Sequence, residues 1–169
     1  MRTVLVVFLG FVMLALESPL LYQLRLNFYA PDLALCVIVY LAMTRPLLYG
    51  ALGAFLLGFF KDGFAGSPMG MYMQILTTAY YLTHYAVERV TIRTWLQLML
   101  LTFCASAVSS TLFFLLSVVF DRNFAHSQLV FKMLIPHALV TAPFAPIVFY
   151  LLQRFDKLPA TNETRVFFE

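Results

Sequence analysis

The sequence predicts an all-α integral membrane protein with six transmembrane helices. Hydrophobic residues make up 62% and charged residues 11% of its 169 residues, whereas soluble domains contain roughly 45–50% apolar and about 25% charged residues. The apolar runs are continuous rather than alternating, which favours helices and excludes transmembrane strands. The length leaves room for one polytopic membrane domain, residues 1–169.

A helix needs about 20 apolar residues to cross a bilayer. The predicted spans are residues 3–22, 28–44, 46–60, 67–87, 95–120 and 133–153, followed by a short tail, 154–169. The first span begins like a signal peptide, but Glu17-Ser18-Pro19 lacks the small-residue cleavage pattern, so we interpret it as retained. Only Arg45-Pro46 separates the second and third spans, which must therefore form a tight helical hairpin.

Prolines mark several predicted helix boundaries. Pro31 suits the first position of the second helix, where Asp32 beside it complements the positive end of the helix dipole. Pro46 is expected to start the third helix in the same way. The last helix is expected to be kinked by its three prolines, Pro136, Pro143 and Pro146.

The segment 50–70 holds six of the seven glycines of the chain. Gly50, Ala54 and Gly58 recur every four residues and therefore form one row on a helix. Small residues in such a row allow a second helix backbone to approach closely, which is how helices associate in lipid. We predict that this row packs against another helix or a partner.

Beyond this row, Lys61-Asp62-Gly63 and Gly66-Ser67-Pro68 are typical of a turn. Asp62 stands out because a carboxylate at membrane depth marks a function or a specific polar pairing. We expect Asp62 to tie this turn to another helix or to a partner; the alternative is that it solvates the loop at the membrane interface. Its neighbours Gly66, Ser67, Pro68 and Gly70 are further candidates for helix packing or partner contact, as are Pro31 and Asp32.

Basic residues are unevenly divided between the two sides that six spans define. One side receives Arg25, Lys61, Arg122 and Lys132, and the other receives Arg2, Arg45, Arg89, Arg93, Arg154, Lys157 and Arg165. Because cytoplasmic loops are enriched in lysine and arginine, the second side is predicted to be cytoplasmic, together with both termini.

Two further groups of side chains, a polar stripe and an aromatic belt, are expected to have structural roles. On the fifth span, a stripe is expected to face protein: Thr102, Ser106, Ser109, Ser110 and Ser117. At the end of the fourth span, an aromatic belt is expected at the membrane interface: Tyr80, Tyr81, His84 and Tyr85.

The sequence contains no signal of catalysis or cofactor binding. It has no G-x-S-x-G, H-E-x-x-H or P-loop motif. The histidines lie on different segments, and both cysteines, Cys36 and Cys104, lie in apolar runs where cysteine acts as a small hydrophobe. A net charge of +3 is too small to indicate nucleic acid as a partner. We therefore predict no catalytic, cofactor-binding or metal-binding residues.

Three features resemble the rod shape-determining protein MreD family. The most general is the combination of length, six spans and a proline-broken last helix followed by a short basic tail; the other two are stretches of sequence. Pro31-Asp32 leading into LALCVIVYLAMTRP is similar to the second helix of that family. The segment 50–70 is similar to its G-x-x-x-G-x-x-x-D-x-x-x-G-S-x-x-G segment, with Gly63 in place of a larger apolar residue. The matching positions after Gly50 are Ala54, Gly58, Asp62, Gly66, Ser67 and Gly70.

The resemblance implies a multi-pass protein of the bacterial inner membrane without catalytic activity. It implies a six-helix fold similar to the substrate-binding subunits of energy-coupling-factor transporters. It also implies a scaffold that binds the single-span protein MreC and, through it, joins MreB, RodA and a class B penicillin-binding transpeptidase. These proteins form the elongation machinery that supports peptidoglycan synthesis and cell shape.

Two other function classes compete with the scaffold. A vitamin-binding subunit of an energy-coupling-factor transporter would dock through an A-x-x-x-A face on its first helix, whereas the first span offers Gly10 and Ala15 at a five-residue spacing. A membrane enzyme acting on lipid carriers would gather polar residues at one interface, whereas here they are scattered. Co-purification of a small ligand would favour the carrier, and turnover of a lipid-linked substrate would favour the enzyme.

Overall fold

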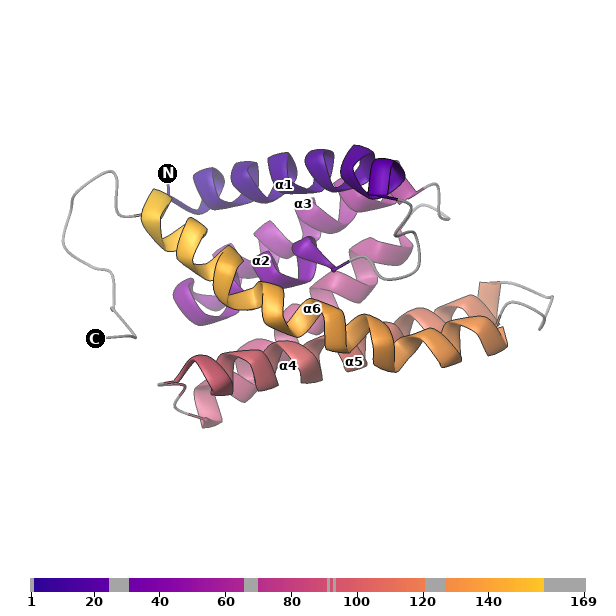
Figure 1. Cartoon of the computed structure of the whole chain (residues 1–169). Coiled ribbons are helices and arrows are strands. Elements are labelled where there is room, and N and C mark those ends of the chain that lie inside the picture. Colours follow the sequence, from indigo (N-terminus) through magenta and orange to yellow (C-terminus); the bar gives the residue numbers. More distant parts are fainter. Residues whose placement is uncertain are drawn as a thin grey trace.

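The computed structural model describes the backbone of residues 2–24, 31–65, 70–90, 92, 94–120 and 127–156, and the side chains of most of them. Every regular element in these ranges is a helix, which confirms the all-α prediction (Figure 1). In chain order the helices are α1 (Arg2–Leu24), α2 (Leu33–Thr44), α3 (Leu47–Ala65), α4 (Met71–Arg89), α5 (Trp95–Phe120) and α6 (Ser127–Asp156).

Three of the described helices are long and apolar enough to cross a membrane. Their apolar windows are Leu47–Phe64 in α3, Trp95–Ser117 in α5 and Ala138–Phe155 in α6. Helices α1 and α2 contribute the shorter apolar segments Thr3–Ala15 and Leu33–Thr44. The protein is therefore a membrane protein, and the number of six spans stays a prediction.

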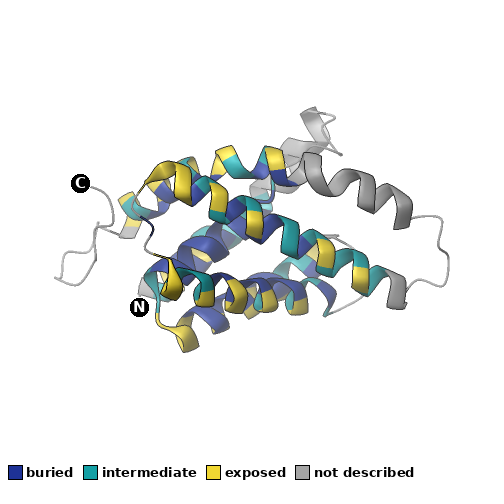
Figure 2. Cartoon of the chain, turned by 90° about the horizontal axis from the view of Figure 1, so that it is seen from below, coloured by how far each residue is buried: buried dark blue, intermediate teal, exposed yellow. Residues whose placement is uncertain are grey.

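Helix α2 lies in the interior and contacts each of the other helices. In Figure 1, α1 runs above it, α5 runs below it and α6 crosses in front of it. All side chains from Ala34 to Met43 are buried, so the helix is apolar on every face, as a fully enclosed helix requires. Figure 2 shows the contrast with the outer helices, on which buried and exposed residues alternate.

The ends of α2 follow from its flanking residues. Asp32 stays extended (φ −81°, ψ 91°) and its side chain accepts a hydrogen bond from the Leu35 N–H, so it is the N-cap of the helix. At the other end, Arg45 is extended (φ −119°, ψ 148°) because the ring of Pro46 disfavours helical dihedrals in the residue before it. Twelve residues make α2 about 18 Å long, which is shorter than the hydrocarbon core of a bilayer, about 30 Å.

These caps correct two predicted boundaries. Pro31 is not the first residue of α2, because the capping role of Asp32 delays the first helical residue to Leu33. Residues 28–30, which the sequence assigns to this span, lie outside the described residues. Pro46 is likewise not the first residue of α3; its carbonyl accepts the first helical hydrogen bond, from the Gly50 N–H at 3.0 Å, so α3 begins at Leu47.

The end of α3 also differs from the prediction. Lys61-Asp62-Gly63 is helical rather than a turn, and α3 continues to Ala65 instead of ending at residue 60. Tertiary partners for Lys61 and Asp62, described below, override the local turn preference of this segment. Helix α5 has the predicted bounds, whereas α6 extends beyond 133–153 at both ends.

Helix α6 contains the three prolines that led us to expect a kink. Pro143 and Pro146 remove the N–H groups that Leu139 and Ala142 would otherwise bind within the helix. Figure 1 shows the axis of α6 changing direction part-way along its length, so that α6 runs beside α5 at one end of the pair and diverges from it towards the other.

Close approach between α3 and α4 depends on glycine. A Cβ atom on Gly58 would lie 2.5 Å from the Met73 Cα atom and 3.0 Å from the Tyr72 carbonyl oxygen, both backbone atoms of α4. A Cβ atom on Gly50 would overlap the ring of Tyr80, whose hydroxyl donates to the Leu47 carbonyl at 3.2 Å. The row of Gly50, Ala54 and Gly58 is therefore turned inward, and Ala54 is fully buried.

We expect Gly58→Ala to lower the free energy of unfolding by about 1–3 kcal/mol, because the added methyl group must displace the α4 backbone. Gly63→Ala is the matched control on the same helix, because no atom lies within 4 Å of an added Cβ atom there. It should leave the stability unchanged or raise it by up to about 1 kcal/mol through helix propensity. Unfolding in detergent measures both variants, and equal stabilities would contradict the close α3–α4 packing.

Candidate functional site

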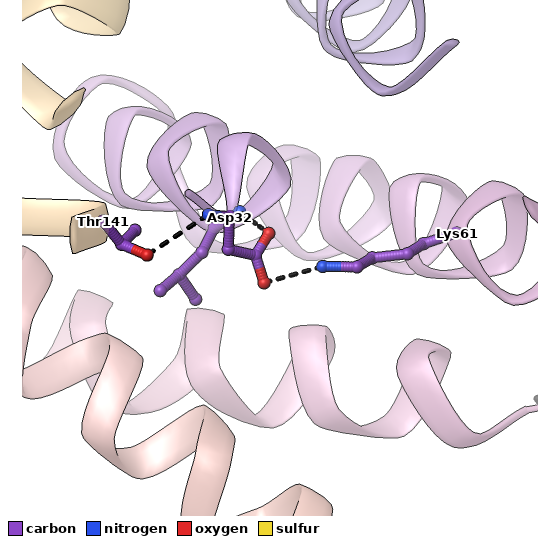
Figure 3. Close-up of polar contacts among 4 residues, drawn as sticks. Asp32, Lys61 and Thr141 are labelled. Carbon is purple, nitrogen blue, oxygen red and sulfur yellow. Dashed lines mark hydrogen bonds and ion pairs between the residues drawn. The ribbon is translucent and has the colours of Figure 1, made fainter. Parts of the chain in front are cut away.

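A buried ion pair joins α2 to α3. The Lys61 Nζ atom lies 2.6 Å from Asp32 Oδ2, and the two side chains are only 14% and 11% exposed. The other carboxylate oxygen, Oδ1, accepts from the Leu35 N–H at 3.0 Å. Figure 3 shows the carboxylate lying between the end of the Lys61 side chain and the first turn of α2.

Asp32 also connects α2 to α6. The Asp32 N–H donates to Thr141 Oγ1 at 3.2 Å (Figure 3), and the Cys36 thiol lies 4.0 Å from the Thr141 carbonyl oxygen. Thr141 is fully buried. The backbone and the side chain of Asp32 therefore hold two other helices against the start of α2.

Lys61 also faces α4. Its Nζ atom lies 4.9 Å from the centroid of the Tyr72 ring, within the range of a cation–π interaction. Lys61 lies three residues before the end of the apolar window of α3, which places it about 4.5 Å inside that window. A charge at this depth is costly unless it is paired, and Asp32 and Tyr72 provide the compensation.

Asp62, the next residue, binds the start of α4. Its side chain is almost fully buried and accepts hydrogen bonds from the N–H groups of Gly70 (2.9 Å), Tyr72 (2.8 Å) and Met73 (3.2 Å). The first N–H groups of a helix have no partner within the helix, and a negative charge there is favourable. Gly70 has φ +94° and no side chain to cap with, so Asp62 supplies the cap from α3.

A second set of contacts fixes the other end of α2. His84 Nδ1 lies 2.9 Å from the Ala42 carbonyl oxygen and is the donor, because a carbonyl only accepts. The last carbonyls of a helix lack internal partners, and this one is satisfied by α4. The His84 ring stacks on Tyr80 with an interplanar angle of 14°, and its Nε2 atom lies 3.5 Å from Glu88 Oε1.

This arrangement corrects the predicted aromatic belt. Tyr80 is fully buried and His84 is mostly enclosed, so both face the bundle; Tyr81 and Tyr85 are exposed as the belt requires. The inward pair was missed because helical spacing alone does not show which face of α4 meets α2. The polar stripe of α5 does face protein at Thr102, Ser106 and Ser109, all of which are buried.

Several predicted residues cannot be placed in this network. Gly66, Ser67 and Pro68 lie outside the described residues. Among the described residues the structure brings together Asp32, Lys61, Asp62 and Gly70. Gly50, Ala54 and Gly58 lie earlier on α3, where Gly50 and Gly58 contact α4. The ion pair itself was not predicted, because nothing in the sequence connects two residues 29 positions apart.

The chemistry of this network is that of helix attachment. Its charged and polar groups bind one another, the N-termini of α2 and α4, and the C-terminus of α2. Within the described ranges, no group of three or more histidine, cysteine or acidic side chains is arranged to hold a metal ion. The network joins α3, α4 and α6 to the two ends of the buried helix α2.

The strength of the ion pair is measurable by a double-mutant cycle. Lys61→Met removes the ammonium group beside the buried Asp32 carboxylate and is expected to cost about 3–5 kcal/mol of unfolding free energy. Asp32→Asn keeps an oxygen for the Leu35 N–H but leaves the Lys61 charge buried. The double variant removes both charges and should be markedly more stable than the sum of the single effects predicts. Unfolding in detergent measures the coupling free energy between the two residues. Additive effects of the two substitutions would contradict a stabilising ion pair.

Comparison with known proteins gives one family. The family model described as rod shape-determining protein MreD matches residues 1–155, which include every residue of the network. A search of curated proteins finds no match, and neither does a search of solved structures.

Proposed function

The chain belongs to the MreD family of rod shape-determining proteins, and on this premise we propose that it is a non-catalytic membrane scaffold of the bacterial elongation complex. Membership implies a role in rod shape determination, and the helices of the chain are those of a membrane protein. The proposed direct partner is MreC. RodA, a class B penicillin-binding transpeptidase and MreB belong to the same proposed complex, which supports peptidoglycan synthesis.

The observation that carries the proposal is the extent of the family match, residues 1–155. The geometry supports it, because Asp32, Lys61, Asp62 and His84 each bind a group on another helix. A fixed bundle of helices suits a protein that presents a constant surface to partners in the membrane.

The surface left for partners and lipid is apolar. On α3 the exposed side chains lie opposite the glycine row: Leu48, Leu52, Phe55, Leu56 and Phe59. On α5 they include Leu96, Leu100 and Leu115. Since the glycine row is occupied by α4, contact with MreC is proposed for these outer faces instead.

We also propose the inner membrane as the location, with both termini cytoplasmic. The arginines Arg45, Arg89 and Arg154 all lie at the end of the bundle where α2, α4 and α6 finish. This supports the orientation, because basic residues are retained on the cytoplasmic side.

Co-purification from native membranes tests the scaffold. The tagged chain should recover an MreC-type single-span protein, and a tagged polytopic protein of similar size should not. Two variants locate the contact: Leu52→Ala/Phe55→Ala on α3 and Leu96→Ala/Leu100→Ala on α5. We expect one of them to lose most of the recovery while the other retains it. Recovery of transporter ATPase subunits instead of MreC would contradict the scaffold and favour the vitamin carrier.

A further inference from the structure

Helices α5 and α6 define one boundary of the membrane. The apolar window of α5 begins at Trp95 and that of α6 ends at Phe155. The two helices are joined at their other ends and pack against each other, so they run in opposite directions. The start of α5 and the end of α6 therefore reach the same interface between lipid tails and headgroups.

A shallow hollow lies just inside this boundary. Its volume is about 310 Å³, and it is lined by Trp95, Pro146, Ile147 and Tyr150. The lining is apolar and partly aromatic, and Trp95 is 42% and Tyr150 59% exposed, so the hollow opens to the surroundings of the protein. Tryptophan and tyrosine favour the headgroup level of a membrane, where one edge of the ring is apolar and the other polar.

Arg154 places a positive charge one turn beyond the hollow on α6. Arg154 follows Tyr150 by four residues on α6, so the two side chains leave the same face one turn apart. Arg154 is exposed and lies in the last turn of α6. At the end of α4, Arg89 is held against Tyr85, with 3.0 Å between Nη2 and the hydroxyl oxygen. The acidic residue of that turn, Glu88, lies beside His84, with 3.5 Å between Oε1 and Nε2.

We infer that this hollow binds one anionic glycerophospholipid. An acyl chain lies against Trp95, Ile147 and Tyr150, and the headgroup phosphate lies beside Arg154. Basic side chains at the membrane surface attract anionic lipids, and an apolar hollow directly below such a charge matches the two parts of a lipid. A partner helix fits the observations less well, because it needs a long face, whereas four side chains form this hollow and a charge borders it.

The chain contains its own reporter for this site. Trp95 is its single tryptophan and lines the hollow, so tryptophan fluorescence reports on lipid in contact with this residue. The protein is reconstituted into phosphatidylcholine vesicles that contain a fixed fraction of lipid with brominated acyl chains, which quench a tryptophan in contact. Brominated phosphatidylglycerol is compared with brominated phosphatidylcholine. We expect the anionic lipid to bind about five-fold more tightly, as one arginine at the surface provides, and high salt should reduce this preference.

Arg154→Gln should abolish the preference and leave quenching by phosphatidylcholine unchanged. Arg89→Gln is the matched control: it removes an exposed arginine at the same end of the bundle whose side chain is held against Tyr85 of α4, and it should retain the preference. Circular dichroism verifies that both variants are folded. Equal quenching by the two lipids in the wild type overturns the inference. This result is expected if lipid binds without selectivity or if a protein segment fills the hollow. A preference that survives in Arg154→Gln, or is lost equally in both variants, overturns it too.

Discussion

The Asp32–Lys61 ion pair fixes the position of the helix on which the others pack. Every face of α2 is apolar and every residue from Ala34 to Met43 is buried, so apolar packing alone favours no particular rotation or depth of this helix. In lipid the hydrophobic effect between helices is also absent. The polar contacts at its two ends determine the rotation and depth of α2. Asp32 binds Lys61 and Thr141 at the start, and the Ala42 carbonyl accepts from His84 near the end.

The end of α3 extends this constraint to α4. Lys61 and Asp62 are neighbours, about 100° apart around the helix axis, and they therefore reach different helices. Lys61 binds the N-cap of α2, whereas Asp62 caps the N-terminus of α4 with three hydrogen bonds. The close approach of α3 and α4 at Gly58 brings this terminus within reach of the carboxylate. One pair of adjacent charges thus sets the arrangement of three helices and leaves an apolar outer surface for lipid and partners.

The sequence was sufficient to predict the helical class, the bounds of α5 and the inward polar face at Thr102, Ser106 and Ser109, because composition and periodicity depend on local chemistry. It was also sufficient to identify the family. The sequence did not predict the conformation of Lys61-Asp62-Gly63. Its local turn preference suggested the end of the helix, whereas contacts of Lys61 with α2 and of Asp62 with α4 keep this segment helical. The ion pair and the His84 contact join residues 29 and 42 positions apart, and only the folded chain brings them together. For the same reason the glycine row could be recognised as a packing face, but not matched to α4.

The enclosure of α2 is tested most directly by the reactivity of its own cysteine. After Cys104→Ala, the single remaining thiol is that of Cys36, which is fully buried. In membranes treated with a permeant maleimide, this thiol should stay unlabelled until the protein is unfolded. The control replaces both native cysteines with alanine and adds Leu52→Cys on the exposed face of α3, where the thiol also has apolar surroundings but lies on the outer surface. Much slower labelling of Cys36 than of this control is the predicted result, and equal rates in the folded protein would contradict a bundle built around α2.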